Sequence, residues 1–151
     1  MPDVATERFT VGVFQDAAWA TRGIDALGRH NFPAEALSII AKATPETEAL
    51  VARTFGAADR MDIKNLGASV LRGPLVAALQ GESHDLAALG LGATMRRVGF
   101  QMHDSFIFET LTARGGVLVA IKSEVRAAEA LAALHAYGGG NAAIGAWTGR
   151  V

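Results

Sequence analysis

Histidine and aspartate stand side by side at two places in the chain, and together these residue types could hold a divalent metal ion. The pairs are His84-Asp85 and His103-Asp104. Imidazole nitrogens and carboxylate oxygens are common metal ligands, and a water or another carboxylate could complete the site. Their spacing matches no established ligand motif, and each pair stands at the expected start of a helix, where aspartate often acts as a cap. We therefore keep these four residues as metal candidates and assign no metal.

Other residues that could support catalysis lack the surroundings that catalysis needs. Ser69 and Ser105 stand outside any Gly-x-Ser-x-Gly context, and Ser123 is expected to cap a helix. Glu109 could act as a general acid or base, although an exposed glutamate on an amphipathic helix is the commoner case. Cysteine is absent, which excludes disulfides and thiolate catalysis. We expect no catalytic residue and no cofactor, so a non-catalytic protein is favoured over an enzyme.

Composition and charge exclude several classes of partner. The net charge is −1 and aromatic residues make up 7% of the chain, which argues against a nucleic-acid binder. A charge-free window, 130–147, contains three consecutive glycines and a histidine, so we expect no membrane span. Residues 1–10 lack an apolar stretch of the kind that a secretory signal needs, and we expect a cytoplasmic location.

The two tryptophans are the candidate interface residues. Trp19 falls outside the helical stripe of Ala20, Ile24 and Leu27, so it could anchor a partner, or it could pack against the insertion. Trp147 stands at the end of the last expected strand.

The elements that would position these residues begin with a β-α-β unit over residues 9–41. The run 9–14 reads as a buried strand, Asp16 as a helix cap, and 17–29 as a helix. Asn31 is expected to end that helix in the left-handed conformation, with Pro33 preventing its continuation. Residues 36–41 form the second expected strand.

A second β-α-β unit is expected over residues 117–147. Its strands are 117–122 and 142–147, and its helix follows Ser123. The two units align with a constant offset in residue number. For example, Asp16 aligns with Ser123 and Asn31 with Gly138. Two such units packed side by side predict an α+β, ferredoxin-like fold with a four-stranded antiparallel sheet and helices on one face.

A mainly helical insertion, residues 42–116, separates the two units within one domain. Pro45 marks a helix start, and the polar stretch after Gly56 is expected to be exposed. A strand or turn and a short helix are expected within 66–79, and two further helices over 84–98 and 102–114. We expect the insertion to pack as a cap.

Several short motifs follow one another in a recognisable order along residues 9–146. They are Val11-Gly12-Val13-Phe14, Asn31-Phe32-Pro33, Leu37-Ser38-Ile39, Gly73-Pro74-Leu75, Gly99-Phe100, Phe108-Glu109 and Gly115-Gly116-Val117-Leu118-Val119. In this order they resemble the general stress protein 17M-like domain family. Two departures are that Asn31 replaces the usual glycine, and that the central glycine- and alanine-rich hairpin is reduced to residues 66–81. The resemblance implies a bacterial stress-associated domain and supplies no catalytic residues.

The expected function is therefore a non-catalytic interaction or assembly domain, either homo-oligomeric or bound to a protein partner. The apolar strands support this expectation, because a second apolar sheet face must be covered by the insertion, by another subunit or by a partner. The alternative is a regulatory domain that senses a small molecule or metal between the sheet and the insertion. A hydrolase or metal enzyme using the His-Asp pairs or Glu109 is a third possibility.

Overall fold

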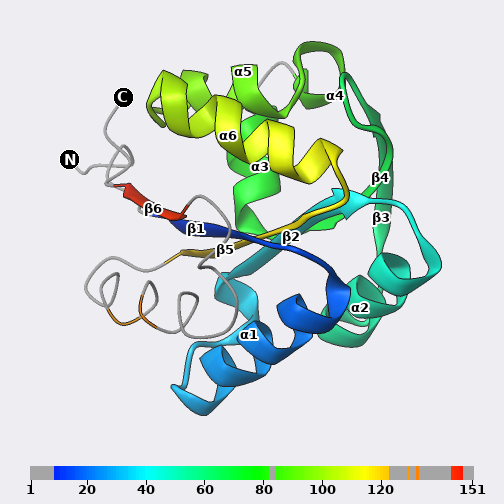
Figure 1. Cartoon of the computed structure of the whole chain (residues 1–151), viewed down its shortest axis with the longest axis vertical. Coiled ribbons are helices and arrows are strands. Elements are labelled where there is room, and N and C mark those ends of the chain that lie inside the picture. The colour runs from blue at the N-terminus through cyan, green and yellow to red at the C-terminus, as the bar shows by residue number, and fades with distance from the viewer. Residues whose placement is uncertain (1–8, 82–83, 123–128, 130–131, 133–143, 148–151) are drawn as a thin grey trace.

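Six strands form one antiparallel sheet in the computed structural model, which describes residues 9–81, 84–122, 129, 132 and 144–147 (Figure 1). Their order across the sheet is β3-β4-β2-β5-β1-β6. The strands are β1 (Phe9–Phe14), β2 (Leu37–Lys42), β3 (Asp59–Ile63), β4 (Gly67–Arg72), β5 (Val117–Lys122) and β6 (Ile144–Trp147).

Strand β5 lies at the centre of the sheet and pairs with both β1 and β2. Because β5 is antiparallel to each of them, β1 and β2 run parallel to one another and end at the same edge. Five consecutive residues of β5, 117–121, are completely buried, as is usual for an apolar run with covered faces on both sides.

Helix α1 (Ala17–Arg29) follows β1 as the sequence predicts. The carboxylate of Asp16 accepts a hydrogen bond from the amide of Trp19 at 2.9 Å, which satisfies one of the free donors of the first turn. Asn31 has a φ of 67°, so the predicted left-handed residue at the helix end is confirmed. A short 3-10 helix, η2 (Ala34–Ala36), then leads into β2.

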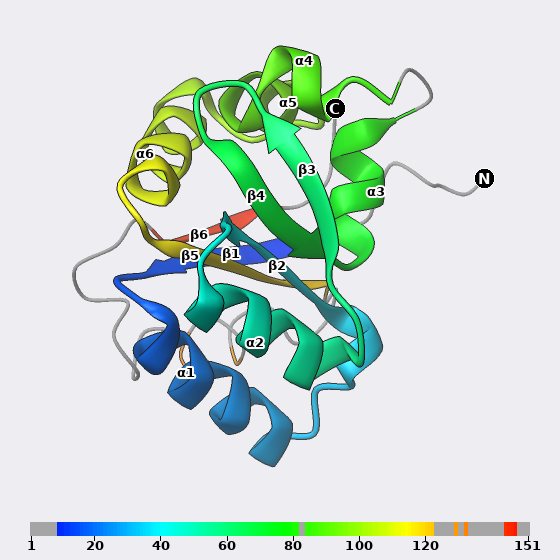
Figure 2. The ribbon, with the colours of Figure 1, turned by 90° about the vertical axis from the view of Figure 1, so that its right-hand side faces the viewer.

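One face of the sheet is covered by α1 and α2 (Pro45–Phe55), which both lie below the sheet in Figure 2. The side chains that fill this layer include Phe14, Leu27 and Val51. Gly23 of α1 allows the close contact with the sheet, because a Cβ atom there would lie 2.4 Å from the ring of Phe14.

The opposite face is covered by four helices of the insertion, which lie above the sheet in Figure 2. They are α3 (Pro74–Gln80), α4 (Leu86–Leu89), α5 (Leu91–Arg97) and α6 (Met102–Ala113). Phe108 of α6 is fully buried and meets Phe100 edge to face, with ring centroids 6.3 Å apart. The second sheet face is therefore covered by the chain's own insertion.

The structure confirms the α+β class and corrects three details of the expected fold. The sheet has six strands instead of four, because the insertion adds the hairpin β3–β4 beside β2. Helices cover both faces of the sheet instead of one. The helix expected over 84–98 is divided into α4 and α5 by Gly90, whose φ of 94° is incompatible with a continuous helix.

The structure describes only part of the second β-α-β unit. Its strands are present as β5 and β6, whereas the helix predicted after Ser123 lies outside the described residues except for Glu129 and Ala132, both of which are helical.

The insertion is joined to the sheet at Ser38, which is fully buried in β2. Its hydroxyl oxygen accepts a hydrogen bond from the amide of Leu75 at 2.9 Å, so a strand residue caps the start of α3. Gly73 makes this approach possible: its φ is 122°, and a Cβ atom there would lie 2.4 Å from the carbonyl oxygen of Leu37.

We predict that Gly73→Ala destabilises the protein by about 3 kcal/mol, because the new methyl group meets the β2 backbone and the φ is unfavourable for alanine. Gly28→Ala is the matched control. Its Cβ would meet no atom within 4 Å, so a gain of about 0.5–1 kcal/mol is expected within α1. Urea unfolding followed by circular dichroism measures both changes. Equal unfolding midpoints for the two variants would contradict the close contact at Gly73.

Candidate functional site

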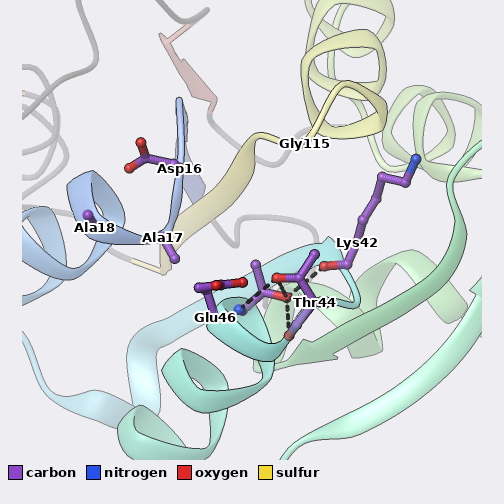
Figure 3. A pocket seen from close by; sticks show the side chains of 8 residues that line it. Asp16, Ala17, Ala18, Lys42, Thr44, Glu46 and Gly115 are labelled. Atoms are coloured by element: carbon purple, nitrogen blue, oxygen red, sulfur yellow. Dashed lines mark hydrogen bonds between the residues drawn. The ribbon is translucent and has the colours of Figure 1, made fainter.

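A pocket lies at the edge of the sheet where β1 and β2 end. Two residues separate β1 from α1, and two separate β2 from α2, so the first turns of both helices reach this edge. The pocket has a volume of about 350 Å³, and Figure 3 shows its surroundings. It is lined by Asp16, Ala17, Ala18, Lys42, Thr44, Glu46, Thr47 and Gly115.

The start of α2 is held by a reciprocal pair of threonines. The hydroxyl oxygen of Thr44 accepts from the amide of Thr47 at 3.1 Å, and the hydroxyl oxygen of Thr47 accepts from the amide of Thr44 at 2.9 Å. The Thr47 hydroxyl also donates to the carbonyl oxygen of Lys42 at 2.6 Å. These hydroxyl groups are committed to shaping the pocket wall, which makes Thr47 unsuitable as a nucleophile.

Lys42 connects the pocket to the end of the insertion. Its ammonium group donates a hydrogen bond to the carbonyl oxygen of Ala113, the last residue of α6, at 3.2 Å, and Figure 3 shows the side chain extending away from Asp16. A cation at a helix C-terminus is favourable because the last carbonyl groups carry partial negative charge. Lys42 therefore holds together the two ends of the insertion, which leave the sheet at β2 and rejoin it at β5.

The charges around the pocket are mixed. Asp16 and Glu46 contribute two exposed carboxylates, and Lys42 contributes one ammonium group. The amides of Ala17 and Ala18 precede the first intrahelical bond of α1, which runs from Ala20 to the carbonyl of Asp16. The exposed surface of this lining is mainly apolar, and it can hold a small molecule. The eight lining residues include no serine, cysteine or histidine.

The residues predicted as metal candidates take structural positions on the insertion. The carboxylate of Asp85 accepts from the guanidinium of Arg97 at 2.7 Å, and His84 is exposed beside it with a φ of 51°. His103 is exposed and Asp104 half-buried in the first turn of α6. Within the described part of the chain, no three histidine or acidic side chains come together in a way that could hold a metal ion.

Glu109 contacts the start of α5. Its carboxylate accepts from the amide of Gly92 at 3.2 Å and from the side-chain amide of Asn65 at 3.4 Å. A Cβ atom at Gly92 would lie 3.0 Å from the Glu109 carboxylate, so glycine allows this approach. The described contacts give Glu109 a role in joining α6 to α5 and to the turn between β3 and β4.

Of the two candidate tryptophans, the structure describes the side chain of Trp19 alone. Trp19 is half-buried against the core layer below the sheet, and the guanidinium carbon of Arg22 lies 4.6 Å from the centre of its ring. Trp19 is therefore packed against a core layer that contains Leu50 and Val51 of the insertion as well as residues of the sheet and α1. The side chain of Trp147 lies outside the described residues.

Two features were missed by reasoning from the sequence. One is the pocket at Lys42 and the Thr44–Thr47 pair, for which the spacing Thr-x-x-Thr before a helix was an available signal. The other is the exposure of Met102 and Phe106 on α6. The spread of apolar residues around α6, instead of along one side, was the signal for this second feature.

Comparison with known proteins gives no further identification: no family model, curated protein or solved structure matches this chain. Within the described residues, no helix has the length and apolar character needed to cross a membrane.

Arg97 provides a test of the structural role assigned to the His84-Asp85 region. Besides Asp85, its guanidinium donates to the carbonyl oxygens of Leu79 and Gln80 at the end of α3. We predict that Arg97→Ala lowers the free energy of unfolding by about 1 kcal/mol, a value reduced by solvent screening of this partly exposed group. Arg96→Ala, at an exposed neighbouring position, is the control and should be neutral within about 0.5 kcal/mol. If both variants unfold at the wild-type urea midpoint, the Arg97 contacts contribute nothing to stability.

Proposed function

We propose that this chain is a non-catalytic assembly domain that associates with a second copy of itself through the outward side of α6. The observation that carries the proposal is the exposure of two large apolar side chains on that helix. Met102 is 63% exposed and Phe106 is 66% exposed. They are four residues apart and therefore lie on the same side of the helix, one turn from each other.

The opposite side of α6 is already packed against other elements of the same chain. Ser105, Phe108 and Thr112 are buried, and α6 contacts the sheet and α5. A helix that is apolar on all sides is normally covered on all sides, whereas a helix with one covered side carries polar residues on the other. Met102 and Phe106 are apolar but exposed, and a second subunit would cover them.

The charges of α6 favour a second copy as the occupant. Its two carboxylates are drawn inward, because Asp104 is half-buried and Glu109 binds the amide of Gly92. If the two-fold axis is perpendicular to the helices, the two copies of α6 run antiparallel, with Phe106 of each near Thr110 of the other. The exposed Arg114 residues of the two helices would then lie at opposite ends of the contact, so they would not repel each other.

The other surfaces of the sheet offer less for assembly. Both faces are covered by helices of the same chain, so the core is complete without a partner. The edge strand β3 exposes Asp59, Arg60 and Asp62, and charged residues on an edge strand oppose strand-to-strand association. The outward side of α6 is therefore favoured over the two sheet faces and the β3 edge as a contact surface.

The proposal also includes the ferredoxin-like core and the family membership that the sequence suggests. We propose that β2, β5, β1 and β6 form a ferredoxin-like core to which β3 and β4 are added; the order of these four strands supports this. The likeness to the general stress protein 17M-like domain family, with the bacterial and cytoplasmic setting it suggests, is supported by sequence motifs. A family without catalytic residues agrees with an assembly role.

A second candidate is a regulatory domain that binds a small molecule. The pocket at the starts of α1 and α2 favours it, because the pocket lies between the sheet and both ends of the insertion. Binding there would link the first turns of two helices to Lys42 and, through its bond to Ala113, to α6. This second function requires no catalytic group.

Substitution on α6 tests the assembly proposal. We expect the wild-type protein to dimerise and Phe106→Gln to weaken the dimer by about 2 kcal/mol, or about 30-fold in Kd, because it removes a central aromatic anchor. Sedimentation equilibrium over a range of protein concentrations measures this change. The thermal midpoint of the isolated monomer should stay close to that of wild type, because Phe106 is exposed.

The matched control is Leu89→Gln, which removes an exposed apolar side chain from α4 instead of α6. It should leave the dimer intact. A wild-type protein that remains monomeric at all concentrations would overturn the assembly proposal, and equal weakening by Phe106→Gln and Leu89→Gln would overturn the placement on α6.

Blocking the pocket tests the second candidate. A panel of nucleotides, amino acids and divalent metal salts is screened for an increase in the thermal midpoint, which a ligand at 100 times its Kd should produce through about 2.7 kcal/mol of stabilisation. Ala18→Glu places a larger, charged side chain in the pocket lining and should abolish the increase. Ala52→Glu, on the exposed side of α2, should retain it. A flat response of the wild type across the panel argues against this function.

A further inference from the structure

We draw no further inference here: the strongest candidate, the pocket between the first turns of α1 and α2 beside Lys42, belongs to the site already described, and its polar groups lie at helix N-termini without a second observation that points to a particular ligand.

Discussion

The pairing of β5 with both β1 and β2 is the constraint on which the rest of the structure depends. Residues 117–121 are completely buried, so the central strand must be covered above and below. The crossover helix α1 and its neighbour α2 cover only one face. The insertion is therefore an essential part of this fold, because its helices α3–α6 supply the second layer. Both layers are needed before the central strand is removed from water.

Strand β2 connects the insertion to the sheet at two points. Ser38 caps the start of α3, and Lys42 binds the last carbonyl of α6. The insertion leaves the sheet after β2, adds the hairpin β3–β4 and the helices α3–α6, and rejoins the sheet at β5 through Gly116. A Cβ atom at Gly116 would lie 2.8 Å from the carbonyl oxygen of Leu111, so only glycine allows this return without a shift of its neighbours. These contacts hold α6 in place with Phe108 facing inward and Phe106 facing outward.

The sequence was sufficient to predict the elements whose signals are local. The cap at Asp16, the left-handed Asn31 and the apolar run of β5 each depend on a few neighbouring residues, and each is present in the structure. Strand β3 was missed because Asp59, Arg60 and Asp62 are exposed, so it lacks the apolar pattern of a buried strand. The division at Gly90 was missed because apolar residues continue at helical spacing on both sides of it.

The candidate sites were harder to predict because they depend on contacts between distant segments. The sequence marks Phe106 and Phe108 alike as apolar, and only the packing of α6 on the sheet decides which of them is buried. Lys42 likewise becomes part of a pocket through its bond to Ala113, which is remote in the sequence. The two His-Asp pairs were notable for residue type alone, and Asp85 is instead paired with Arg97.

The central claim, association of two copies through the outward side of α6, is tested most directly by chemical cross-linking. The chain contains no cysteine, so a single introduced thiol is a unique label. Thr110→Cys places the thiol one turn from Phe106, and Ala52→Cys places it on the exposed side of α2. With a short bis-maleimide at low micromolar protein, Thr110→Cys should give a covalent dimer and Ala52→Cys should remain monomeric. Cross-linking of Ala52→Cys alone, or of both variants equally, would contradict the account.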